Sequence, residues 1–125
     1  MKNLIIKQEF TIKQSLKRLN QSGEKSLVVV DPNTNVLLGT ISDGDLRRAI
    51  LSGSIINDSI SEIYEKNPTA LIEGSFKNSD VKKIFINKKY DIIPVVNNKK
   101  ELVNILTWDV VFKNDKKIIN ESVAD

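Results

Sequence analysis

Residues 39–45 combine the side chains and spacing best suited to chemistry in this chain, and that chemistry is the binding of a phosphorylated sugar. The segment reads Gly-Thr-Ile-Ser-Asp-Gly-Asp and joins a β-branched run to a helical pattern. The first amides of a helix have no intrahelical partner and lie at the positive end of its dipole. A phosphate fits there beside the Ser42 hydroxyl. Asp45, one turn further on, can accept hydrogen bonds from both hydroxyls of a ribose.

The neighbours of this pair extend the predicted site. Gly39 lacks a side chain, so backbone or a nucleotide base can approach closely. Thr40 and Asp43 belong to the same segment, and we include both among the predicted ligand-binding residues. Arg48, or Arg47 beside it, adds positive charge that can reach a phosphate.

Two other interpretations of the segment remain open. Ser-x-x-Asp before an apolar helix is also a capping box, in which Ser42 and Asp45 satisfy the helix amides without any ligand. The Asp43-Gly44-Asp45 triplet is compatible with a metal site, although no further carboxylates converge on it in the sequence.

The chain repeats this pattern once. Moved along by 65 positions, Ser42 falls on Thr107, and Leu27-Val28 falls on Ile92-Ile93. A fixed period indicates one supersecondary unit used twice, with each copy covering the apolar face of the other. The repeat therefore predicts two copies that share one core and enclose a site between them.

The second copy lacks part of the binding pattern. Val110 stands at the position that matches Asp45, and Asn104 replaces Gly39. Asp109 comes one residue early, about 100° around the helix from the expected direction. We include Thr107 and Asp109 in the predicted site, but we expect one competent and one degenerate half. Trp108 is either a stacking surface for a base or a lid on the core.

Both copies read as β-α-β-β-α, so we predict an α/β fold of two such repeats related by a pseudo-two-fold axis. Capping and hydrophobic periodicity define the expected elements. In the first copy these are a strand at 4–6, a helix between Thr11 and Gly23, a hairpin at 26–41 and a helix at 42–53. In the second they are a strand at 69–72, a helix capped by Ser75, a hairpin at 91–106 and a helix from Thr107. A connector helix at 58–66 is expected between the copies.

Composition narrows the function. With no cysteine and no histidine in 125 residues, the chain has no thiolate nucleophile, imidazole base or Cys/His zinc site. We therefore predict that it is not itself an enzyme and carries no catalytic cofactor. No apolar run approaches the about 20 residues that span a bilayer, and no signal peptide is evident, so we predict a cytoplasmic protein without membrane contact. The net charge of +3 is scattered, which argues against nucleic-acid binding.

Three separated motifs resemble those of cystathionine β-synthase (CBS) domains. Residues 38–50 resemble the signature segment, residues 58–68 the junction between two domains, and residues 92–97 the second strand. The resemblance covers about residues 3–113 and implies a tandem CBS pair, also called a Bateman module. It implies that Ser42 and Asp45 contact the phosphate and ribose of an adenosine-type ligand. Neighbouring strand residues would supply the base pocket, with Ile5, Ile6 and Val28 as candidates unless they belong to the core.

The same resemblance implies a regulatory function. CBS pairs bind a nucleotide such as AMP or ATP in the cleft between copies and control an attached or partner enzyme by allostery. The sequence of residues 42–50 is similar to that of CBS pairs joined to two groups of enzymes. In sugar nucleotidyltransferases the pair comes first, and in arabinose-phosphate isomerases it comes last. The first strand begins directly after Met1, which favours the first arrangement. The alternative is a pair that serves assembly only, without a functional ligand site.

The predicted organisation is a first repeat at 1–57, a second repeat at 58–114 that includes the connector, and a tail or linker at 115–125. Within the tail, Ile118-Ile119 could pack on the domain or lead into a further one. Apolar residues lie widely around the short helices, among them Leu51 and Val110. They predict a homodimer formed through helix faces.

Overall fold

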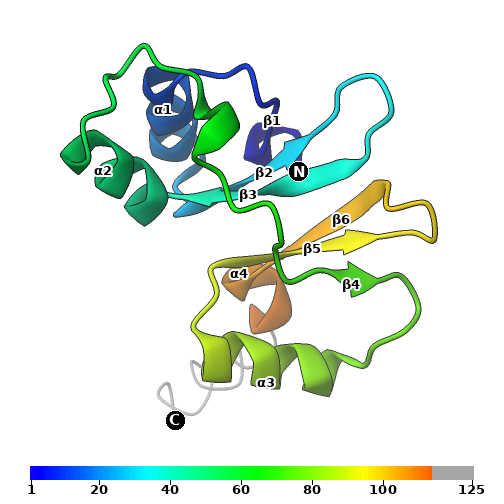
Figure 1. Ribbon diagram of the computed structural model, residues 1–125. Coiled ribbons are helices and arrows are strands. Elements are labelled where there is room, and N and C mark those ends of the chain that lie inside the picture. Colours follow the sequence, from blue (N-terminus) through cyan, green and yellow to red (C-terminus); the bar gives the residue numbers. More distant parts are fainter. Residues whose placement is uncertain (114–125) are drawn as a thin grey trace, which may run out of the picture.

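The computed structural model describes residues 1–113, and the predicted tail at 115–125, with Ile118-Ile119, lies outside them. Two three-stranded sheets stand side by side, with strand orders β1-β2-β3 and β4-β5-β6 (Figure 1). Each sheet carries its own helices on the outer side, α1 and α2 on one and α3 and α4 on the other. The predicted α/β fold of two β-α-β-β-α repeats is confirmed.

The first half owes its element boundaries to local capping chemistry. Thr11 and Gln14 form a capping box at the start of α1, and Gly23 ends that helix with a left-handed φ of 73°. The β2–β3 pair is an antiparallel hairpin, while β1 pairs with β2 in parallel. The elements of this half are η1 (Lys2–Leu4), β1 (Ile5–Ile6), α1 (Ile12–Ser22), β2 (Ser26–Val30), β3 (Leu37–Ser42) and α2 (Asp43–Leu51).

The second half repeats these pairings with two departures from prediction. Its helix α3 starts at Asn78 rather than after Ser75, whose hydroxyl instead donates to the Ile72 carbonyl at 2.6 Å. Its last helix, α4, has only four residues. The elements of this half are β4 (Leu71–Ile72), α3 (Asn78–Lys88), β5 (Ile92–Val96), β6 (Leu102–Thr107) and α4 (Trp108–Val111).

The structural repeat is not the ungapped one read from the sequence. Ser26 pairs with Ser42, whereas Ile92 pairs with Thr107, so Ser26 corresponds to Ile92 and not to Asp91. Up to the hairpin turns the two halves match at an offset of 66 residues, and from β3 and β6 onward at 65. The second turn is one residue shorter than the first. Leu27 therefore matches Ile93, and the predicted match to Ile92 is wrong by one residue.

The predicted shared core is instead two clusters, and the larger one crosses between the halves. It is built on the first sheet but also includes Ile92, Leu102 and Ile105 of the second. The smaller cluster, around Val81, Phe85 and Ile93, lies between the second sheet and its helices. Burial of Ile92, Leu102 and Ile105 against the first half explains why the two repeats stand together, since apolar area removed from water stabilises their contact.

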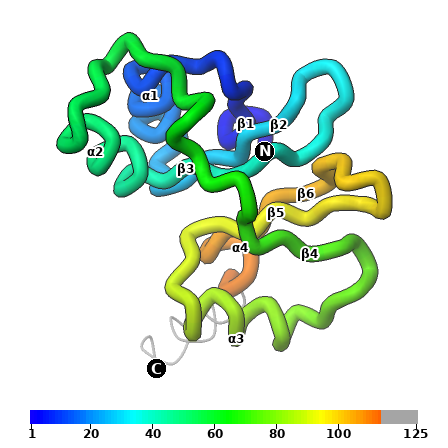
Figure 2. Tube along the Cα trace, in the orientation of Figure 1, coloured from blue at the N-terminus to red at the C-terminus, as the bar shows by residue number. Residues whose placement is uncertain are grey.

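The connector is mostly irregular rather than helical. A single 3₁₀ turn, η2 (Ile60–Glu62), replaces the helix predicted at 58–66. Backbone hydrogen bonds to the first half use the groups that a helix would need, as in Ile60 N–H to Phe10 O at 2.9 Å. Ile60 and Tyr64 are buried in the first core. The connector thus crosses the first sheet before descending to β4, as the trace in Figure 2 shows.

The two hairpins meet at their turns. Val36 bridges Glu101, the Leu37 amide donates to the Lys100 carbonyl at 2.9 Å, and the Leu102 amide donates to the Asn35 carbonyl at 2.9 Å. Asn35 and Lys100 occupy equivalent positions, and both have left-handed backbone, with φ of 63° and 64°. This junction fixes the pseudo-two-fold arrangement at the turn end of the sheets.

Candidate functional site

The predicted phosphate-binding turn at the start of α2 is occupied by a capping box. The Ser42 hydroxyl accepts from the Asp45 amide at 3.0 Å, and Asp45 Oδ2 accepts from the Ser42 amide at 2.9 Å. Asp45 Oδ1 also pairs with Arg48 at 2.7 Å, and its side chain is 27% exposed. The Ser-x-x-Asp spacing therefore has a structural use in this chain, and Asp45 Oδ1 could meet a ligand only by exchanging its arginine.

Packing against the connector explains why position 39 is a glycine, and the sequence alone did not indicate this contact. A Cβ placed there would overlap the Glu65 carbonyl oxygen and lie 2.6 Å from the Tyr64 ring. Thr40 and Glu65 exchange two backbone hydrogen bonds, of 3.1 and 2.8 Å, which hold the connector across β3 at this point. The close approach predicted at Gly39 is thus made by the connector itself.

A cavity of about 200 Å³ opens between the halves beside Thr40, two residues before Ser42 on β3. We call it the Thr40 pocket. Its wall includes a hydroxyl pair, since the Thr69 and Tyr90 oxygens are 2.7 Å apart. The pocket is lined by Thr40, Glu65, Asn67, Pro68, Thr69, Tyr90 and Ile92.

Of the predicted site residues in the first half, only Thr40 lines this pocket. Ser42, Asp45 and Arg48 lie beyond it at the start of α2, and Asp43 pairs with Arg47 at 3.2 Å. The base-pocket candidates belong to the core, because Ile6 and Val28 are buried and Ile5 packs against them.

The connector and β4 entry residues, Glu65 to Thr69, were missed by the sequence reasoning. Asn67-Pro68 did mark a break before β4. Nothing local indicated that this break faces Thr40.

The second half has an equivalent cavity of about 310 Å³, which we call the Val110 pocket. At the structural offset Met1 matches Asn67, Asn3 matches Thr69, and Glu24 matches Tyr90. The Val110 pocket is lined by Met1, Asn3, Leu4, Ser22, Glu24, Asn104, Ile105, Thr107 and Val110. The fold therefore presents the same place twice, with different side chains.

The Val110 pocket lacks the carboxylate of the cap and has an acidic wall instead. Thr107 Oγ1 accepts from the Val110 amide at 3.4 Å, so the helix is capped by one hydrogen bond without a partner carboxylate. Burial raises the pKa of Glu24 above its ordinary value of 4.5, and the negative charges of Asp109 and Asp91 raise it further. A phosphate entering this pocket would meet the Glu24 side chain, which is the acidic residue of its lining.

Trp108 covers the second core. Its ring stacks on Phe112 with centroids 4.6 Å apart and meets the edge of Phe85 at 5.6 Å. Its indole Nε1 donates to the Tyr90 carbonyl at 2.6 Å, which joins α4 to a residue that lines the Thr40 pocket. The structure thus supports the lid interpretation of Trp108.

Residues 1–113 contain no cluster of three or more His, Cys, Asp or Glu side chains able to hold a metal ion. No helix in this range combines the length and apolar character needed to cross a membrane.

Comparison with known proteins agrees with this architecture. The CBS domain family matches residues 1–52. An arabinose 5-phosphate isomerase from Francisella tularensis is 30% identical over 112 residues, which cover 87% of this chain and 33% of the isomerase. The chain therefore spans about a third of the length of that relative.

Solved structures show the same fold for the whole pair. The CBS-pair protein CBSX2 from Arabidopsis thaliana superposes with a TM-score of 0.75 at 22% identity, covering 95% of this chain and 90% of that one. CBSX2 in complex with AMP has a TM-score of 0.74 at 22% identity, covering 91% and 87%. The cytosolic domain of the Mg²⁺ channel MgtE in complex with ATP has a TM-score of 0.69 at 20% identity, covering 89% and 44%. Residues 1–52 are thus a CBS domain, and the described chain has the fold of a tandem CBS-domain pair.

Proposed function

We propose that this chain is a ligand-sensing regulatory module that binds a purine ribonucleotide between its two repeats. The main support is the position of the Thr40 pocket between the two halves. Thr40 lies two residues before Ser42, the N-cap of α2, on the same strand. The base would enter beside Thr40, and the ribose and phosphate would extend along β3 toward Ser42 and Asp45. The AMP and ATP complexes of the structural neighbours support this ligand class.

The Asp45–Arg48 pair supplies a mechanism for sensing. Its 2.7 Å contact occupies Asp45 Oδ1, and the arginine side chain is 69% exposed. In our proposal a ribose takes the place of the guanidinium at Asp45, and Arg48 then swings to the phosphate. The exchange needs little energy because exposed ion pairs contribute only about 0–1 kcal/mol.

Binding between the halves would change their relative position, and this change would be passed to an enzyme. A ligand can shift such an equilibrium only by its different affinity for two states, typically about 1–3 kcal/mol. We propose an attached or partner enzyme of sugar-phosphate or sugar-nucleotide chemistry, since the related isomerase extends well beyond the matched region. In this proposal the pair itself is not catalytic and acts in the cytoplasm.

The domain assignment remains part of the proposal. We place the first repeat at 1–57 and the second at 58–114. Residues 58–65 of the connector nevertheless pack on the first half, through contacts such as Ile12 N–H to Asp58 O at 2.9 Å.

A melting-temperature titration with AMP, ATP, GTP and S-adenosylmethionine tests the proposal. A ligand at 100 times its Kd stabilises the folded state by about 2.7 kcal/mol, so the binding nucleotide should raise Tm by several degrees. The absence of a shift with all four at millimolar concentration would contradict ribonucleotide sensing.

Assembly without a ligand is the second candidate, because Ser42 and Asp45 are already used in the cap. Large apolar side chains also remain exposed, with Leu51 at 80%, Ile55 at 62% and Val110 at 60%. We propose that these faces form a homodimer in either case. Light scattering at micromolar concentration should give twice the monomer mass, and Leu51→Glu should reduce it; a monomeric mass for the unmodified chain would contradict the dimer.

A further inference from the structure

A third and larger cavity lies on the other side of the connector from the Thr40 pocket, at the hairpin end of the sheets. Its volume is about 460 Å³, within the usual range of about 300–1,000 Å³ for small-molecule sites. Asn67 and Pro68 line both this cavity and the Thr40 pocket, so the connector forms the wall between them. We call it the Lys100 cavity.

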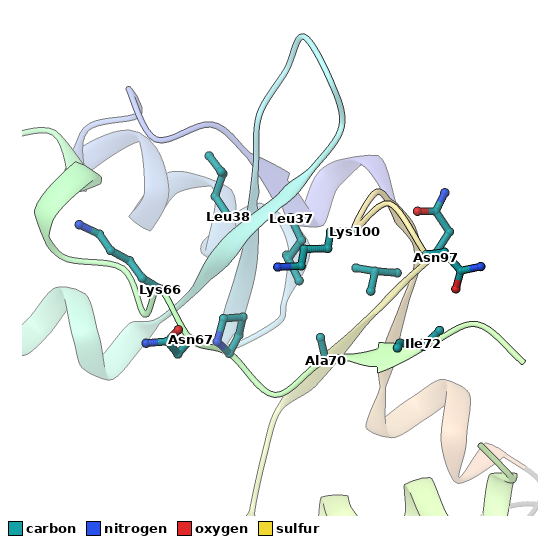
Figure 3. A pocket seen from close by; sticks show the side chains of 11 residues that line it. Leu37, Leu38, Lys66, Asn67, Ala70, Ile72, Asn97 and Lys100 are labelled. Atoms are coloured by element: carbon teal, nitrogen blue, oxygen red, sulfur yellow. The ribbon is translucent and has the colours of Figure 1, made fainter. Parts of the chain in front are cut away.

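Most of its wall is apolar and comes from both halves. Leu37 and Leu38 come from β3, Ile72 from β4 and Val96 from β5. Figure 3 shows Ala70 below Leu37, at the floor of the cavity. Ile72 is 50% exposed although it belongs to a strand. An occupant with an apolar body would remove these side chains from water.

Two lysines, Lys66 and Lys100, line the cavity, and they differ in their pairing. The Lys100 side chain extends over the opening between Leu37 and Ala70, as Figure 3 shows, and none of the lining residues is acidic. Among residues 1–113 no carboxylate lies within 4.0 Å of its ammonium group. Lys66 differs, because its ammonium is 3.7 Å from Glu62 and lies over the Tyr64 ring.

The position of Lys100 is fixed by the backbone. Its amide donates to the Asn97 carbonyl at 3.0 Å, and its carbonyl accepts from the Leu37 amide at 2.9 Å. Left-handed backbone favours Gly and Asn over lysine, and the equivalent residue in the first half is Asn35. The turn therefore does not require a lysine at this position, since Asn35 makes the same turn in the first half.

Comparison with the first half shows why the Lys100 cavity is open. Leu4 corresponds to Ala70 at the structural offset and is 7% exposed, and it belongs to the 3₁₀ turn η1 that precedes β1. The second half has neither the turn nor the leucine, and Ala70 leaves the floor of the cavity open.

We propose that the Lys100 cavity binds a small molecule with one acidic group, a carboxylate or a phosphate, on an apolar body. Lys100 pairs with the acidic group, and the apolar body lies against Leu37, Leu38 and Ile72. This site is separate from the proposed nucleotide site and does not depend on it.

Amide chemical-shift titration with phenyl phosphate and with benzoate tests the proposal. Both probes should give saturable shifts at Leu38, Ala70, Ile72 and Lys100, and the tighter one identifies the preferred acidic group. Benzyl alcohol and inorganic phosphate, which each lack one half of the proposed ligand, should bind at least about tenfold more weakly, because the charge-assisted contact and the apolar contact are both required.

Two variants and one control separate the contributions. Lys100→Asn copies Asn35, so it keeps the turn and removes the charge, and the Kd for the better probe should rise about fivefold or more. Ala70→Leu copies Leu4 and fills the floor, and the shifts should disappear. Lys99→Asn removes a neighbouring charge that does not line the cavity, and it should leave the Kd unchanged.

Equal effects of Lys99→Asn and Lys100→Asn would overturn the proposal. Saturable shifts centred on Thr40, Thr69 and Tyr90 would also overturn it, since the probes would then occupy the Thr40 pocket. A failure of nucleotide binding would leave this result unaffected, so the two proposals can fail separately.

Discussion

The Thr40 pocket and the Val110 pocket are the same place in two copies of one fold, and they differ in charge and in capping. The first stands before a complete Ser42/Asp45 box and contains the Tyr90 hydroxyl. The second has Val110 in place of the carboxylate and Glu24 in place of the tyrosine. A repeat can thus preserve the position of a cavity while its chemistry diverges, because backbone pairing maintains the position and a few side chains decide the ligand.

The largest expected effect concerns the strand beside each pocket. Gly39→Ala should destabilise the fold by about 2–3 kcal/mol, because its Cβ has no space against Glu65 and Tyr64. Asn104→Ala, at the equivalent position of β6, should cost far less because that side chain is exposed. Urea unfolding of both variants measures the difference, and equal losses would show that the connector does not crowd Gly39.

A smaller effect is expected when Tyr90 of the Thr40 pocket is replaced by the residue type found at the equivalent position of the Val110 pocket. Tyr90→Glu introduces the charge that Glu24 carries in the other half, and it should weaken AMP binding at least about tenfold through repulsion of the phosphate. Tyr90→Phe keeps the ring and serves as the control, with an expected change of less than about threefold. Calorimetric titration measures both. Similar losses in the two variants would assign the effect to the hydroxyl and not to charge.

The smallest effect concerns pH. Because the pKa of Glu24 is raised in the folded state, the native protein holds this proton more tightly than the unfolded chain does. The stability from this group is present below the unfolded pKa near 4.5 and is lost as pH rises through the folded value. Glu24→Gln should remove this loss, so its urea midpoint should exceed that of the unmodified protein at pH 7 but not at pH 4.

Glu9→Gln is the matched control, since Glu9 is an exposed glutamate outside both pockets. It should show the same pH profile as the unmodified chain. An identical profile for Glu24→Gln would mean that the ionised Glu24 carboxylate does not destabilise the native state.

Much of the fold followed from local chemistry. Thr11, Gly23 and Ser42 mark helix ends through their own side chains or backbone, and all three were predicted in place. The repeat offset was wrong by one residue from β4 to β5. In β5 the pattern fits either alignment because Ile92 and Ile93 are equally apolar, and the strand pairing of Ile92 with Thr107 decides between them.

The candidate site was less predictable because the residues that line it are far apart in the sequence. Glu65 reaches Thr40 through backbone hydrogen bonds, which any residue can form and which leave no trace in the sequence. The predicted connector helix was wrong because some of its backbone groups pair with Phe10 and Thr40, which are far away in the chain. Conversely, Ser42 and Asp45 carried enough local signal to predict their hydrogen bonds in the cap.

The most direct test of the central claim is the AMP stoichiometry of the unmodified protein and two variants, measured by isothermal titration calorimetry. We expect one AMP per chain, lost or weakened at least about tenfold in Asp45→Asn, where the amide can still accept the Ser42 hydrogen bond but the carboxylate charge is gone. Asp80→Asn, which changes the same capping position in α3, should bind like the unmodified protein. Two equivalent AMP molecules per chain, or undiminished binding by Asp45→Asn, would contradict a single nucleotide site in the first half.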